Sequence, residues 1–174
     1  NPNPSEFFSD GLHHSTGVIE LGDLNLEKEQ ATKLSITLQK KYTDFSLEVN
    51  PYINHIQNYM FLRPVGFETT IRGAFPVWEY QQTDASLIGI DFQTNWNITS
   101  QWQYLFSFAY VNGRDISNKQ SLIDIPPVNL NNKISFSKKE WHQLLLELKS
   151  EIVFSQNKYP DNNFYTNIIK NDSF

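Results

Sequence analysis

Apolar and polar residues alternate one by one through most of this 174-residue chain, and this pattern limits the chain to β-structure. In the stretch 45–50, for example, Phe45, Leu47 and Val49 are each followed by a polar residue. Successive side chains of a strand point to opposite faces, so each such stretch predicts a strand with one apolar face. Six stretches follow the pattern: 33–39, 45–62, 86–96, 102–110, 130–136 and 144–154. We expect no amphipathic helix.

The apolar phase changes once within the second of these stretches. Up to Val49 the apolar residues occupy odd-numbered positions, whereas Ile56, Met60 and Leu62 occupy even-numbered ones. A β-bulge inserts one extra residue into a strand and thereby moves later side chains to the other face. The sequence therefore predicts a bulge near residues 51–54.

The predicted connections alternate in length along the chain. Short turns are expected at 40–44, 98–101 and 137–140, and long loops at 63–77, 112–127 and 155–163. If the strands pair antiparallel in sequence order, every short turn lies at one edge of the sheet and every long loop at the other. Outer-membrane barrels have this arrangement. The predicted fold is therefore all-β, an antiparallel up-and-down meander of about six long strands of the kind found in transmembrane β-barrels.

In this meander the register is set by the apolar pattern, because a slip of one residue would move every apolar side chain to the wet face. We expect one face to carry Leu34, Leu47, Ile90, Phe106, Ile134 and Leu146. The opposite face carries mid-strand charges, which a water-filled lumen would accept: Glu48, Asp91, Glu147, Lys149 and Glu151.

Aromatic residues make up 14% of the chain and gather near the ends of the predicted strands. Tryptophan and tyrosine are enriched at both interfaces of a membrane, so two rings of them bracketing an aliphatic band indicate a membrane barrel. The predicted interface residues are Tyr42, Trp96, Trp102 and Trp141 near the short turns, and Trp78 and Tyr110 near the long loops. In a soluble protein the same aromatics would line the two edges of a sandwich core.

Charge and composition exclude several other classes. The net charge is −5 and there is no basic stripe, so we expect no nucleic-acid partner. The chain has no cysteine, which rules out disulfides and thiolate catalysis. No nucleotide-binding loop and no HExxH motif is present, so we predict no enzyme activity and no cofactor.

Four short motifs, in order, resemble the barrel region of TonB-dependent outer-membrane receptors. The first is the opening segment 1–14, and the second is the Gly-Asp-x-x-Leu-x-x-Glu element at 22–29, which lacks the usual proline before its glutamate. The third is 80–85 leading into 89–91, and the fourth is 110–115 followed by 125–127. The resemblance covers roughly residues 1–160.

This resemblance implies a barrel of about 22 strands with an N-terminal plug. It also implies that the predicted meander is a segment of a large transmembrane β-barrel. Such a receptor lies in the outer membrane of a Gram-negative bacterium and imports a scarce nutrient with the inner-membrane TonB complex. At about 9–11 residues a strand, 174 residues hold only part of such a barrel. We therefore expect a fragment without the plug, surrounded by outer-membrane lipid. Its expected parts are an extracellular segment at 1–31 and strand hairpins at 32–62, 78–111 and 128–155.

The ligand would bind at the edge of the long loops, where we place four candidate residues. His13 and His14 lie in a loop with carboxylates nearby and could bind zinc or a haem iron, although a solvated loop would look the same. Arg72 and Arg114 fall in predicted long loops and could meet an anionic siderophore. The resemblance makes an iron complex the default substrate, with haem or zinc as the more specific alternatives.

Two other classes of protein stay open at this stage. The first is a soluble β-sandwich of the carbohydrate-binding type, with tryptophans stacking on sugars. The second is a complete small outer-membrane barrel. Flanking sequence and solubility without detergent would separate them from a receptor fragment.

Overall fold

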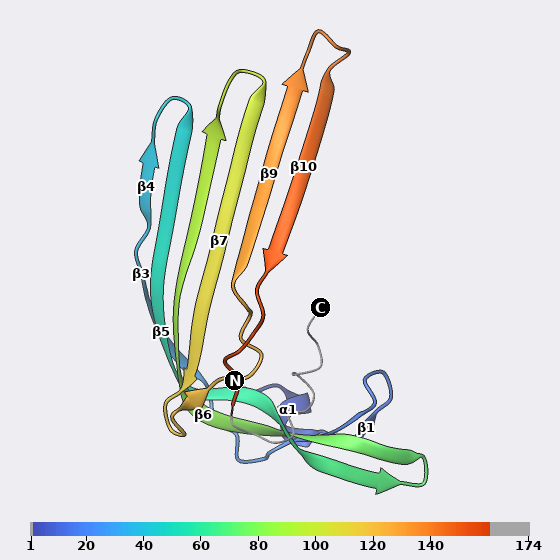
Figure 1. Ribbon diagram of the computed structural model, residues 1–174. Coiled ribbons are helices and arrows are strands. Elements are labelled where there is room, and N and C mark those ends of the chain that lie inside the picture. The colour runs from blue at the N-terminus through green and yellow to red at the C-terminus, as the bar shows by residue number, and fades with distance from the viewer. Residues whose placement is uncertain (1, 161–174) are drawn as a thin grey trace.

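The computed structural model describes residues 2–160, and within them the chain forms one sheet with a short helix (Figure 1). The sheet stands as a curved wall, and its longest hairpin continues past one edge and bends away from the wall (Figure 1). The elements are α1 (Pro4–Phe8), β1 (Asp10–His13), β2 (Val18–Leu21), β3 (Gln30–Ser35), β4 (Leu38–Lys41), β5 (Phe45–Thr70), β6 (Gly73–Asn97), β7 (Trp102–Asp115), β8 (Gln120–Ser121), β9 (Asn129–Lys138) and β10 (Leu144–Val153).

The strands of the wall pair antiparallel in sequence order, as predicted. β3 and β4 pair with β5, and the sheet continues through β6, β7 and β9 to β10. Residues directly opposite one another share a face. Thr94 is opposite both Leu47 and Phe106, for example, and Phe136 is opposite Leu146.

Applied across the sheet, this pairing confirms the predicted register. Leu34, Leu47, Ile90, Phe106, Ile134 and Leu146 all lie on one face. Asp91 follows Ile90 in continuous strand and faces the opposite way.

Two of the short turns, at 42–44 and 98–101, lie where the sequence predicts them. The third is predicted at 137–140 but lies at 139–143, because β9 continues to Lys138 and β10 begins only at Leu144. All three gather at the upper edge in Figure 1. The long connections leave from the opposite edge. A single sheet of this shape gives no support to the sandwich alternative, because no second sheet packs on it within residues 2–160.

The predicted long loop at 63–77 is wrong. β5 and β6 remain paired up to Thr70 and Gly73, so the segment is a hairpin closed by a tight turn at Ile71 and Arg72. Gly73 has φ 128°, a conformation that favours glycine. Two prolines and a register shift after Pro64 interrupt the alternation here, which is why the sequence pattern suggests a loop.

The predicted bulge exists, but its predicted position is wrong. Pairing is unbroken through residues 51–54, and the register shifts between Ile56 and Tyr59. Asn58 takes up the extra residue with φ 56°, in the left-handed region that asparagine tolerates better than most residues.

The segment 1–31, predicted as a loop, has its own structure. Asn3 and Glu6 form a capping box at the start of α1. β1 and β2 form a hairpin, and β2 lies parallel to β6 at residues 77–79. β3 begins at Gln30, slightly before the predicted strand. No helix in the described part of the chain has the length and apolar character of a membrane span.

Candidate functional site

One face of the wall is apolar and exposed to its surroundings. Leu34, Leu146 and Leu148 are each more than half exposed, although leucine normally avoids water. Other exposed members of the same face are Ile36, Leu38, Ile53, Ile88 and Ile152. We call this surface the outer belt. A continuous apolar surface of this extent needs a nonpolar neighbour, because it would otherwise associate nonspecifically in water.

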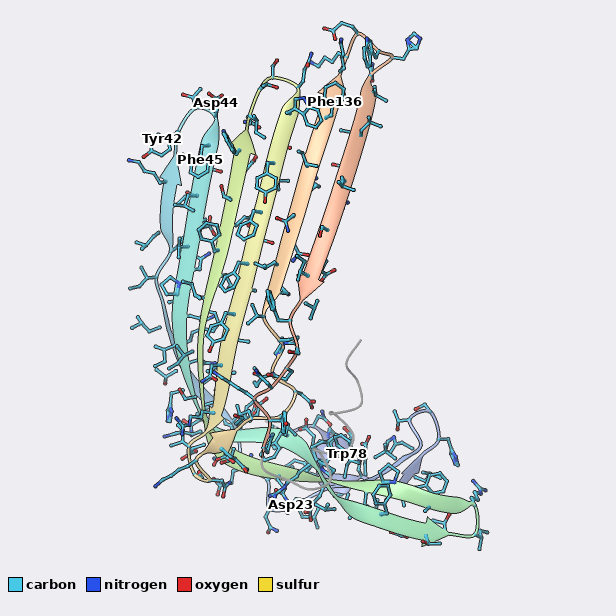
Figure 2. All side chains as sticks on the ribbon, viewed as in Figure 1. Asp23, Tyr42, Asp44, Phe45, Trp78 and Phe136 are labelled. Carbon is cyan, nitrogen blue, oxygen red and sulfur yellow. The ribbon has the colours of Figure 1, made fainter. Side chains whose placement is uncertain are left out.

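Aromatic residues border the outer belt at the edge of the short turns. Trp96, Trp102, Trp141 and Tyr42 are all substantially exposed there, and Figure 2 shows Tyr42 with Phe45 and Phe136 near this edge. Two lysines stand over the rings: the Lys138 amine lies 4.1 Å from the Trp141 ring centre and the Lys40 amine 5.4 Å from that of Tyr42. Amphipathic rings with adjacent cations are typical of a membrane interface.

At the opposite edge the two predicted aromatics are separated. Tyr110 lies on β7 opposite Ile90, at the end of the outer belt. Trp78 lies ten residues before Ile88, about 33 Å along β6. It belongs to the part of the β5–β6 hairpin that bends away from the wall (Figure 2). Tyr110 therefore borders the belt, whereas Trp78 lies well beyond it.

The other face of the wall is polar, and we call it the lumen face. The Lys133 amine donates to Oε1 of Glu147 at 3.0 Å, and the Ser135 hydroxyl donates to the same oxygen at 3.2 Å. Further along, Glu48 accepts hydrogen bonds from the amides of Gln39 and Asn50. A hollow of about 450 Å³ lies mostly over this face. Its lining includes Gln93, Ser107, Asn131, Lys133, Lys149 and Glu151.

The connection between β7 and β9 folds back over the lumen face. Leu122 and Ile123 are almost fully buried, and Leu122 packs with Ile56 and Ala85. Gly113 makes room for this packing: a Cβ there would lie 2.4 Å from Cδ1 of Ile125. A small core cluster is therefore formed by a long connection packed onto the wall.

Asp115, at the end of β7, holds the start of this connection. Its side chain is 1% exposed and accepts hydrogen bonds from the Thr83 hydroxyl at 2.6 Å, from the backbone and side-chain nitrogens of Asn118, and from Gln120. Asp115 lies five residues beyond Tyr110 and thus outside the outer belt. Burial by itself would raise the pKa of the carboxyl, but these hydrogen bonds outweigh it and lower the pKa below the ordinary value.

The predicted ligand residues lie at the edge of the long connections or beyond it. His13 ends β1, and its Nε2 is 3.5 Å from Oε2 of Glu20 on β2. His14 is in the turn between these strands, and Arg72 is at the tip of the β5–β6 hairpin. Arg114 lies on β7, on the same face as the outer belt. Within residues 2–160 no group of three or more metal-ligating side chains is arranged to hold a metal ion.

A hydrogen-bonded cluster at the bend of the wall could not be recognised from sequence as such. The Gln82 amide donates to the carbonyls of Glu27 and Asn58, and the Glu27 amide donates back to the Gln82 side chain. Glu29 accepts from the backbone N–H of Met60, and Asp84 accepts from that of Asn58. Gln82 and Asp84 of β6 thus satisfy the backbone groups of Asn58 at the bulge, and Glu29 of the Gly-Asp-x-x-Leu-x-x-Glu element satisfies the N–H of Met60 beside it. The motif at 22–29 was the only feature of the sequence that pointed to this cluster.

Comparison with known proteins agrees with this geometry. Residues 1–174 match the family model described as TonB dependent receptor-like, beta-barrel. Among solved structures, the copper transporter OprC is similar, with a TM-score of 0.72 and 18% sequence identity over 90% of this chain. The chain spans about 22% of the length of that transporter. No curated protein sequence matches the chain.

Proposed function

The chain belongs to the TonB-dependent receptor-like β-barrel family, and from this premise we propose that it forms part of the barrel wall of a nutrient receptor. The receptor resides in the outer membrane of a Gram-negative bacterium and imports its ligand with energy supplied through the inner-membrane TonB complex. Proteins of this family are transporters, and the proposal assigns this chain the same role.

The observation that carries the proposal is the pair of contrasting faces. The outer belt exposes leucine and isoleucine on every strand of the wall except β7 and β9, where Phe106, Phe108, Leu130 and Ile134 continue it. The lumen face offers hydrogen-bonded charges such as Glu147 with Lys133. Such a sheet is stable only with lipid on one side and water or polar protein on the other.

For the substrate we propose a metal ion or metal complex captured at the edge of the long connections. His13 and Glu20 place an imidazole nitrogen and a carboxylate 3.5 Å apart on an exposed hairpin, and both groups ligate metals. Remaining ligands would come from His14 or from the substrate. An iron complex, haem and zinc stay the candidates, and the name of the similar copper transporter adds copper to the ions to be tested.

Uptake by the full-length receptor tests both the transporter assignment and the choice of substrate. Cells that express it are supplied with ferric siderophore, haemin, zinc or copper, in strains with and without a working TonB complex. We expect uptake of one of these to require both the receptor and TonB. Uptake that is equal without TonB would overturn the transporter assignment.

The double substitution His13→Ala and His14→Ala tests the metal proposal separately. We expect it to weaken binding of the identified metal at neutral pH while leaving the receptor folded in the outer membrane. His55→Ala, which removes a histidine from the wall, is the matched control. Unchanged metal binding in the double variant would reject the histidine hairpin as the capture site and leave the transporter assignment intact.

A further inference from the structure

A row of polar residues marks the limit of the outer belt on the side of the long connections. Four residues are paired in register across four strands, and all face outward: Thr32, His55, Ser86 and Arg114. The preceding row, two residues nearer the short turns, is still mainly apolar: Leu34, Ile53, Ile88 and Asn112. Thr32, His55 and Arg114 are all exposed. The belt therefore ends abruptly at a polar row that includes an arginine.

A lysine from a distant segment is held beside this row. The Lys158 amine donates to Oδ1 of Asn112 at 3.1 Å and to the Tyr110 hydroxyl at 3.3 Å. It also stands 5.8 Å from the centre of the Tyr110 ring. Tyr110 and Asn112 both face outward, so their contacts hold the amine on the outer side of β7. Both partners are neutral, so they orient the amine without cancelling its charge.

The cations of Arg114 and Lys158 both lie on the outer side of β7, and neither is held in an ion pair, although Asp124 lines a small cavity together with Lys158. Arg114 is two residues beyond Asn112 on the same face, which is about 7 Å along the strand. Among the residues that the structure describes, no carboxylate forms an ion pair with either cation. Asp84 is the next acidic residue on this face, and its Oδ1 accepts from the Asn58 N–H. Asp115 points to the lumen face.

We propose that Arg114 and Lys158 bind a phosphate of a lipid headgroup in the outer leaflet of the membrane. Headgroups lie at the level where the apolar belt ends, and the tyrosine at this level is typical of that interface. Basic side chains beside a membrane attract anionic headgroups, and arginine can hold a phosphate through two parallel hydrogen bonds. The hydroxyls of Thr32 and Ser86 lie in the same row and can donate further hydrogen bonds.

This assignment goes beyond the transport function and gives Arg114 a different use from the substrate contact that its sequence position suggests. Its side chain faces away from the lumen, so a ligand that passes through the barrel is separated from it by the sheet. The assignment depends on the membrane orientation in the proposed function but is independent of the substrate.

The test compares lipid binding by the full-length receptor and by the double variant Arg114→Gln and Lys158→Gln. Purified receptor is reconstituted in nanodiscs of a neutral lipid containing a small fraction of either lipid A or dephosphorylated lipid A. Lipid retained after extraction into mild detergent is measured by native mass spectrometry. We expect the wild type to retain lipid A and the double variant to retain about tenfold less. The reason is that each basic side chain near a membrane surface strengthens the binding of anionic lipid. Dephosphorylated lipid A should be retained poorly by both.

Two further variants make the result specific. Lys33→Gln with Lys149→Gln removes the same charge from the lumen face and should leave retention unchanged. Arg114→Lys with Lys158→Arg keeps the charge and should retain lipid A. Equal retention by wild type and the Arg114/Lys158 double variant would overturn the proposal. So would an equal loss in the lumen control, or displacement of the lipid by inorganic phosphate at a similar concentration.

Discussion

The ring of Tyr52 lies directly over Gly89 of the neighbouring strand, and a Cβ on Gly89 would be 2.3 Å from its Cζ. The two residues are paired across β5 and β6 on the lumen face. The Lys33 amine stands 4.9 Å from the centre of the same ring. Gly89 thus provides a flat surface on which a large ring packs against the wall of the barrel, and this contact ties β5 to β6 at mid-height.

Replacing Gly89 with alanine should destabilise the receptor, because the new methyl group displaces Tyr52. Overpacking of this kind costs about 1–3 kcal/mol. The free energy of unfolding in urea, measured for the reconstituted full-length receptor, checks this. Gly66→Ala is the matched control, since nothing lies within 4 Å of a Cβ at that position. A Gly89→Ala receptor as stable as the control would contradict the packing described.

Replacing Phe106 with arginine should hinder insertion, because Phe106 lies midway along the outer belt between Trp102 and Tyr110. Arginine on the lipid face near the bilayer midplane costs about 2–4 kcal/mol. The fraction of heat-modifiable, folded receptor in the outer membrane measures the effect. Ser107→Arg places the same residue on the adjacent position, which faces the lumen side, and should be tolerated. If both variants fold equally well, the assignment of the two faces is incorrect.

Replacing Asn58 with alanine should loosen the bend of the β5–β6 hairpin. The backbone of Asn58 has φ 56°, which costs about 1–2 kcal/mol for a residue with an ordinary Cβ. The substitution also removes the hydrogen bond from Nδ2 to Glu27. Spin labels on the hairpin tip and on the wall should report a broader distance distribution. Asn58→Gly relieves the backbone strain and should give a narrower distribution than alanine; equal distributions for all three receptors would exclude a role in the bend.

The contacts of Asp115 predict a pH dependence with a definite sign. Its pKa is lower in the folded protein than in the unfolded chain, so the ionised form stabilises the fold. That stabilisation is fully present above the ordinary aspartate pKa of about 3.9 and is lost as the pH falls through the lower folded value. Proteolysis of the connection 116–128 should therefore be slow and constant from neutral pH down to about 4. An acid-stable protease should cut it faster only below that.

Asp115→Asn provides the control for this pH profile. The amide cannot accept all the hydrogen bonds that Thr83, Asn118 and Gln120 donate, so the connection should be cut faster at every pH. The rate at which the protease cleaves this variant should also not rise at low pH. A variant that keeps the wild-type profile would show that another group anchors the connection.

The sequence by itself determined the wall of the barrel. Alternation between Leu47, Val49 and their polar neighbours defined the two faces. Only one pairing register then places the apolar side chains of β5 to β10 together on a single face. The short turns followed from the same pattern, because the alternation stops where each strand ends. The alternation is strong in the wall because one of its faces is apolar and the other is polar.

Only the tertiary structure decided what lies beyond the outer belt. In the hairpin past Asn58, two prolines and a second register shift interrupt the alternation, so the pattern does not predict that residues 63–77 are strands. The bend depends on hydrogen bonds between Gln82 and residues 27–29, which are distant in sequence. Lys158 reaches the outer face of β7 through contacts with residues 46 and 48 positions away. Local sequence records the preferences of a strand for its two faces, whereas such long-range contacts depend on the path of the whole chain.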